Sequence, residues 1–145
     1  MIPGFSPERV AGAGRPMTIG AVPSGVEPLI LADLARKTGP VAYVLSDGQR
    51  ISDLEQMLGF VAPDIPVLTL PGWDCLPYDR VSPSAEVSAR RLSALSALIA
   101  HRKKPHAAIV LVTVNAMLQK TASRTVIENL AFSARPGNQV RMDDI

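Results

Sequence analysis

The sequence predicts an α/β domain in which a parallel sheet is flanked by helices. Short, almost continuously apolar runs alternate along the chain with segments whose apolar residues recur at helical spacing. Runs of the first kind are typical of strands buried in a parallel sheet, and segments of the second kind are typical of the helices that cover it. The core must be aliphatic, because aromatics make up only 4% of the 145 residues.

The N-terminal part begins with a stretch that has little apolar periodicity. Residues 1–17 are rich in proline and glycine, and we expect a flexible extension there. Residues 18–22 form a short candidate strand. The apolar residues of the segment 26–37 mark one face of a helix, which Gly39 and Pro40 end.

The next strand and helix follow directly. Residues 41–46 (VAYVLS) are nearly all apolar, which predicts a strand buried on both faces. Asp47 can cap a helix that ends near Gly59. The apolar residues of this helix are Ile51, Leu54, Met57 and Leu58.

A third unit of the same kind occupies the middle of the chain. Residues 67–70 form a short strand, and the Pro- and Gly-rich residues 71–79 a structured loop. Ser82 and Pro83 open the next helix, with Pro83 suited to its first position. The apolar stripe of this helix consists of Leu92, Leu95 and Ile99.

The strongest strand signal lies at residues 107–114 (AAIVLVTV). Residues 129–135 read as the start of a further strand, and residues 142–145 as the first turn of a helix. No terminating signal follows. We expect the chain to be a fragment of a longer protein.

The composition indicates a soluble, cytoplasmic protein. No apolar run approaches the length of a membrane span, and no secretory signal is recognisable at the N-terminus. The single cysteine, Cys75, cannot form an internal disulfide, which fits a reducing compartment. A net charge of +2 does not by itself indicate nucleic-acid binding.

The segment from Gly20 to Glu27 has the glycine spacing of a phosphate-binding loop, G-x-x-x-x-G-K-[ST], through its second glycine, Gly25. Val26 replaces the lysine that would reach the phosphates, and Glu27 replaces the hydroxyl that would hold magnesium. A carboxylate at a helix N-terminus also competes with phosphate for the same positive site. Ser24 and Glu27 fit a capping box, which explains both residues without a ligand. The loop is therefore interpreted as degenerate.

No other constellation predicts catalysis or a metal site. We expect His101 and His106 to be solvated loop histidines, because no further ligand stands at metal spacing. Cys75 has no paired histidine and reads as a structural thiol. Asp74 and Asp79 could be an acid–base pair, but acidic residues in such loops more often form caps and turns.

The basic residues also have structural explanations. Residues 102–104 (RKK) could contact DNA phosphates, although the C-terminus of a helix alone accounts for them. Arg90 and Arg91 lie in the middle of the third helix, and we expect both on its solvated side.

One segment carries a family resemblance. The run 70–79 (LPGWDCLPYD), followed by Ser82-Pro83 and by residues 90–95 (RRLSAL), resembles the N-terminal region of bacterial transcription-repair coupling factors (Mfd). Residues 112–119 (VTVNAMLQ) resemble the next strand and turn of that family, so that the resemblance covers residues 18–145. The signature positions are Trp73, Asp74, Leu76, Pro77, Tyr78 and Asp79.

The resemblance implies a fold and partners. It implies a RecA-like domain at residues 18–128, related to the repair protein UvrB, and the start of a UvrA-docking domain at residues 129–145. It further implies a parent protein that is an ATP-dependent DNA translocase, which releases stalled RNA polymerase and recruits nucleotide excision repair. UvrB has a long β-hairpin where this chain is short, which argues against direct lesion recognition here.

The function expected from the sequence is that of a non-catalytic scaffold. By the resemblance, UvrA would bind mainly through the next domain, RNA polymerase and DNA through other domains of the parent, and this segment would make intramolecular contacts. ATP and magnesium would belong to the motor domains alone, so no cofactor is expected here. The alternatives are residual nucleotide binding by the loop from Gly20 to Glu27 and a weak DNA-binding surface at residues 102–104.

Overall fold

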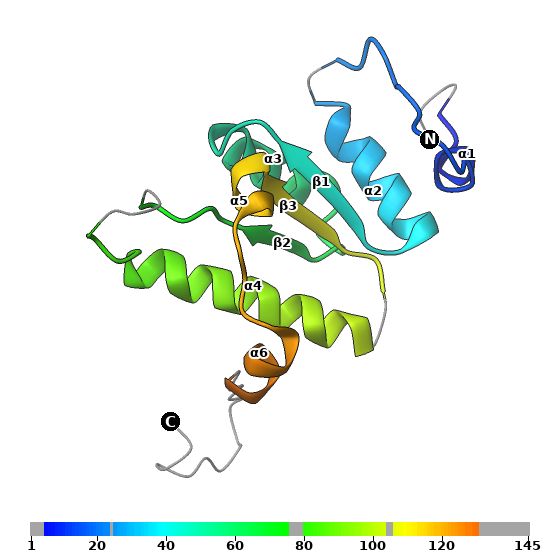
Figure 1. Cartoon of the computed structure of the whole chain (residues 1–145). Coiled ribbons are helices and arrows are strands. Elements are labelled where there is room, and N and C mark those ends of the chain that lie inside the picture. The colour runs from blue at the N-terminus through cyan, green and yellow to red at the C-terminus, as the bar shows by residue number, and fades with distance from the viewer. Residues whose placement is uncertain (1–4, 24, 76–79, 104–105, 131–145) are drawn as a thin grey trace.

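The computed structural model describes residues 5–23, 25–75, 80–103 and 106–130. Its centre is a three-stranded parallel sheet with the strand order β1-β3-β2 (Figure 1). Every pairing is parallel, with Val41 and Val67 both opposite Ile109. The expected α/β class with a parallel sheet is therefore confirmed. The strands are β1 (Val41–Leu45), β2 (Val67–Leu70) and β3 (Ile109–Thr113).

Helices precede, connect and follow these strands. The strand β3 lies between β1 and β2 although it comes last along the chain, because the helix after β2 returns the chain to the middle of the sheet. The helices are α1 (Pro7–Ala11), α2 (Glu27–Thr38), α3 (Gln49–Val61), α4 (Ala85–Lys103), α5 (Val114–Leu118) and α6 (Arg124–Leu130).

The main core lies where α2 and α3 meet the sheet. Apolar residues at helical spacing on both helices are buried in one cluster with Leu45 of β1 and with Ile109 and Leu111 of β3, which is the pattern that the sequence predicted. The helix α4 packs along β2, and α6 packs against α4 (Figure 1). The core residues of the two helices are Leu31, Ala32 and Ala35 on α2 and Ile51, Leu54 and Leu58 on α3.

The N-terminal part differs from the expectation. Residues 18–22 are not a strand; they are exposed or half-buried coil that runs beside α2. The segment 1–17, expected to be an extension, contains the short helix α1. This helix packs against α2, with Glu8 and Lys37 paired at 3.5 Å. Strand formation needs a neighbouring strand as well as apolar residues, and residues 18–22 find none.

The expected burial of β1 on both faces is wrong. Exposed residues, of which Val44 is 42% exposed, alternate with half-buried ones, and Leu45 at the end of the strand is buried. Alternate residues point to opposite faces of a strand, so one face of β1 packs against α2 and the other, with Ala42 and Val44, faces solvent. The next helix also differs: α3 continues past Gly59 to Val61, and Met57 faces solvent at 43% exposure.

The helix α4 begins later and has a different buried face than expected. It starts at Ala85, so that Pro83 lies outside it rather than at its first position. Leu92 is 52% exposed, whereas Arg91 and Ala94 are buried. The apolar stripe that the sequence predicted, Leu92, Leu95 and Ile99, therefore does not coincide with the buried face of the helix.

The strand β3 ends at Thr113, and Val114 opens the short helix α5. The expected strand at residues 129–135 is contradicted at its first two residues, since Asn129 and Leu130 complete the helix α6. The remainder of that expectation, and the expected helical turn at residues 142–145, fall outside the described residues. Within the described part of the chain, no helix is long and apolar enough to cross a membrane.

Candidate functional site

The segment with phosphate-loop glycine spacing does not leave the end of a strand. Residues 18–22 are coil, and α2 begins at Glu27, directly after Val26. Two residues take the left-handed backbone conformation, Ala21 at φ 53° and Gly25 at φ 89°. A phosphate loop owes its cradle of backbone N–H groups to a fixed passage from strand to helix, and that strand is missing from the described residues.

The carboxylate of Glu27 is held by a neighbouring helix. Arg50 of α3 donates two hydrogen bonds to it, at 2.9 and 2.8 Å. The bond to Glu27 is also the largest reason that the pKa of Arg50 is raised. The expected capping box depends on Ser24, which lies outside the described residues, while no side chain caps α2 at Val26. Glu27 therefore links α2 to α3 through a bidentate ion pair.

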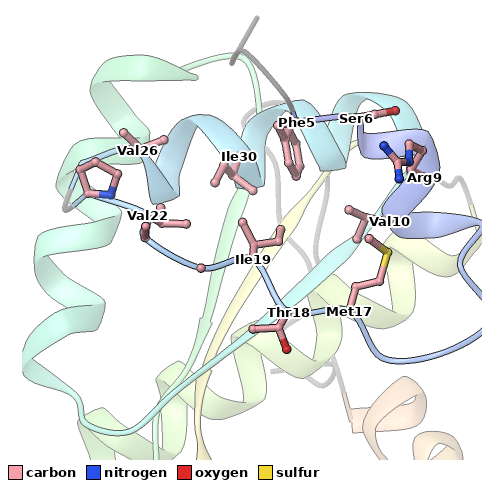
Figure 2. Close-up of a pocket in the computed structure, with 13 residues that line it drawn as sticks. Phe5, Ser6, Arg9, Val10, Met17, Thr18, Ile19, Val22, Val26 and Ile30 are labelled. Atoms are coloured by element: carbon pink, nitrogen blue, oxygen red, sulfur yellow. The ribbon is translucent and has the colours of Figure 1, made fainter.

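The same segment lines a hollow of about 480 Å³ between α1 and α2. Figure 2 shows Phe5, Val10 and Met17 around this space together with Ile19 and Ile30. Its lining contains one charged side chain, Arg9, and no carboxylate. The walls are therefore mainly aliphatic, which is unlike a cradle for a triphosphate.

The tryptophan loop, residues 71–75, is fixed by contacts from two later elements. The backbone N–H of Trp73 donates to the side-chain oxygen of Gln119 at 2.8 Å. The guanidinium of Arg91 lies 4.4 Å from the centre of the Trp73 ring and donates from Nη1 to the carbonyl of Pro71. It also donates to Gln119 at 3.3 Å. Of the expected signature positions, Leu76, Pro77, Tyr78 and Asp79 lie outside the described residues.

Arg91 is the residue that the sequence misplaced most. It was expected on the solvated side of its helix, yet it is 1% exposed. Burial lowers the pKa of its guanidinium, and Nη2 has no hydrogen-bond partner among the described atoms. The cause is the preceding loop, which crosses α4 at this point and places acceptors and an indole ring over the guanidinium. Arg90, its neighbour, is exposed as expected.

Asp74 caps the helix that follows its loop. Its carboxylate accepts from the backbone N–H of Ser84 at 3.1 Å. Hydrogen bonds from the side chain and the backbone of Ser84 lower the pKa of Asp74. Ser84 in turn accepts from the N–H of Val87 at 3.3 Å. Because Asp79 lies outside the described residues, the acid–base pair is untested, and the capping role of Asp74 is confirmed.

The histidines do not both behave as expected. His101 belongs to α4 and is 7% exposed, which contradicts the expectation of a solvated loop residue. Its Nε2 accepts from the backbone N–H of His106 at 3.5 Å, and the two ring centres are 4.0 Å apart. His106 is exposed, as expected. The chain that follows α4 returns over the ring of His101 and places His106 against it.

The carboxyl ends of all three strands meet at a second hollow, of about 520 Å³. Ligands of open α/β sheets bind most often at this edge, where the connections of adjacent strands leave toward opposite faces. Here its wall includes Asp47, Trp73 and Asn115, together with the half-buried thiol of Cys75. No group of three His, Cys, Asp or Glu side chains that could hold a metal occurs within the described ranges.

The fold and the site together define the class: a parallel α/β domain in which Arg91 and Gln119 hold the tryptophan loop in place. Over 121 residues the chain is 31% identical to the transcription-repair-coupling factors of Mycobacterium bovis and Mycobacterium tuberculosis. The match covers 81% of this chain and 10% of each relative. The Escherichia coli protein of the same name is 26% identical over 132 residues, which is 90% of this chain and 11% of that protein.

These matches confirm the resemblance that the tryptophan loop indicated: the chain resembles a portion of a transcription-repair coupling factor. It spans about a tenth of the length of these relatives. No protein-family model matches the chain, and no solved structure matches it at a significant level.

Proposed function

We propose that this chain is a non-catalytic scaffold segment of a transcription-repair coupling factor. In this proposal it acts in the cytoplasm as part of an ATP-dependent translocase that displaces stalled RNA polymerase from DNA. It supports the neighbouring domain that recruits UvrA. ATP and magnesium serve motor domains elsewhere in the parent.

One observation carries the non-catalytic part of the proposal. The segment from Gly20 to Glu27 lacks the lysine and hydroxyl of a phosphate loop, and Glu27 is paired with Arg50. Glu27 stands at the position of the hydroxyl that would hold magnesium, and its carboxylate would compete with phosphate for the positive end of α2. Residues 18–22 also supply no strand to aim the loop.

A nucleotide titration tests this part. A fluorescent ATP analogue with magnesium is titrated against the chain and followed by fluorescence anisotropy. We expect no saturable binding up to millimolar analogue. Saturable binding in the micromolar range would overturn the non-catalytic proposal and favour residual nucleotide binding instead.

A second titration tests the partner. Purified UvrA is titrated with this chain and with a longer polypeptide that continues through the whole next domain. We expect binding by the longer polypeptide alone. Equal binding by both would place the contact surface within residues 1–145, and no binding by either would remove UvrA from the proposal.

A DNA-binding titration at several salt concentrations tests the alternative that residues 102–104 form a weak DNA-binding surface. The affinity of a surface at residues 102–104 for duplex DNA should fall steeply with salt, because binding would release counterions from the phosphates. The expected result is no measurable affinity at physiological salt. So few charges would neutralise only a few phosphates.

A further inference from the structure

The hollow between α1 and α2 has no role in the proposed scaffold function. Its volume of about 480 Å³ lies within the range of about 300–1,000 Å³ that is usual for small-molecule sites. It is bounded by the helix α1, by the coil 17–23 and by one side of α2 (Figure 2). We propose that it binds a small amphipathic carboxylate, a molecule with an aliphatic chain and a terminal carboxyl group.

The aliphatic lining of the hollow predicts that the ligand carries an aliphatic chain. Figure 2 shows the aliphatic side chains of Ile19, Val22 and Ile30 gathered on one side of the hollow, with Val10 and Met17 on another. Ile19 and Met17 are 44% and 47% exposed, although both face this space. Covering such surface with an aliphatic chain removes apolar area from water, which is favourable.

The one charged side chain of the lining, Arg9, predicts that the polar end of the ligand is an anion. Arg9 lines the hollow and forms no ion pair or hydrogen bond with any described residue. The nearest acidic residue along the helix, Glu8, pairs with Lys37 and accepts a hydrogen bond from Ser6. No carboxylate belongs to the lining, so the guanidinium of Arg9 is available to an incoming anion.

The charges also set the direction in which the ligand lies. A smaller adjoining hollow shares Ile19, Val22 and Ile30 and contains the carboxylate of Glu27. The carboxylate of Glu27 is already paired with Arg50, and the lining at that end offers no cation to a second carboxylate, whereas Arg9 attracts one at the other end. The carboxyl group therefore lies at Arg9 and the aliphatic chain points toward Ile30.

Octanoate is the probe, titrated into the chain labelled with nitrogen-15 and followed by amide chemical shifts. For a ligand of this size we expect a dissociation constant on the order of a millimolar. The shifted amides should lie in residues 5–30. Octanol and octylamine, which replace the carboxylate with a neutral group and a cation, should bind about two- to five-fold more weakly.

Two variants and their matched controls sharpen the result. Arg9→Gln should weaken octanoate about two- to five-fold and leave octanol unchanged, because it removes only the charge. Ile19→Asn should weaken both probes about ten-fold. Arg15→Gln and Val81→Asn change an exposed charge and an exposed apolar residue outside the hollow, and should leave binding unchanged.

Three outcomes would overturn the proposal. They are octanol binding as tightly as octanoate, octanoate binding that Arg9→Gln does not change, and shifts centred outside residues 5–30. Tighter binding by a short peptide with an apolar C-terminal residue would replace the small acid with a protein carboxylate. Failure of any of these tests leaves the scaffold proposal intact, since that proposal does not depend on Arg9 or Ile19.

Discussion

Two of the loops that lead into helices, one before α2 and one before α4, are held very differently. The coil before α2 has the glycine spacing of a phosphate loop but follows no strand. The tryptophan loop starts at the carboxyl end of β2, and later parts of the chain fasten it: Arg91 contacts Pro71 and Trp73, and Gln119 accepts from Trp73.

The difference shows that glycines permit a loop conformation without fixing it. Gly25 allows a left-handed backbone at φ 89°, but no strand among the described residues positions the segment for a phosphate. The tryptophan loop has few special backbone requirements and is nevertheless ordered, because partners distant in sequence supply its hydrogen bonds. In this chain, contacts from distant residues, rather than the spacing of glycines, hold a loop in place.

Removing the central contact of the tryptophan loop should have the largest effect. We expect Arg91→Ala to lower the free energy of unfolding by about 3 kcal/mol, because it leaves a cavity and buried acceptors without a donor. Urea denaturation followed by circular dichroism measures it. Arg90→Ala, one residue away on the exposed side, should stay within about 0.5 kcal/mol of the unchanged chain.

A second variant separates packing from charge at the same position. Arg91→Met keeps an unbranched aliphatic stem and removes a buried cation with an unpaired nitrogen, so we expect a loss of about 1 kcal/mol or less. If Arg91→Ala were as mild as Arg90→Ala, Arg91 would not fasten the loop and the comparison would fail.

The cap at Asp74 should give a smaller, pH-dependent effect. Asp74→Ala removes the acceptor for the N–H of Ser84 and should lower stability less than Arg91→Ala does. The pKa of Asp74 is lowered in the folded chain, so its stabilisation is complete above about pH 5 and is lost as the pH falls through the folded value.

Unfolding curves collected between pH 2 and pH 7 check this dependence. The difference between Asp74→Ala and the unchanged chain should shrink toward acid pH. Asp74→Asn keeps a side-chain acceptor and should behave more like the unchanged chain. A pH-independent difference would mean that the carboxylate charge does not take part in the cap.

Completing the phosphate-loop motif should have the smallest effect. The double substitution Val26→Lys and Glu27→Thr turns residues 20–27 into GAVPSGKT, which satisfies the full pattern. We nevertheless expect no saturable binding of ATP with magnesium, because no strand positions the loop. Isothermal titration calorimetry measures it, and micromolar binding would show that local sequence alone is sufficient here.

Much of the fold could be predicted from local patterns. The helix at residues 26–37 and the strands at residues 67–70 and 107–114 all form close to their expected limits. Apolar spacing and the stop signals at Gly39 and Pro40 are properties of short segments, so they can be read directly. Residues 18–22 were misread for the converse reason, since a strand needs a partner that the sequence does not reveal.

Local sequence was enough to predict the parallel α/β class, the resemblance carried by Trp73 and its neighbours, and the absence of a phosphate-binding lysine at Val26. The burial of Arg91, the cap that Asp74 provides for α4 and the pairing of Glu27 with Arg50 depend on contacts between distant segments. The physical reason is the same in each case. The residues around a charged side chain in the sequence are the same whether that side chain is solvated or paired. The partners here lie 10 to 28 positions away along the chain, so local sequence does not reveal them.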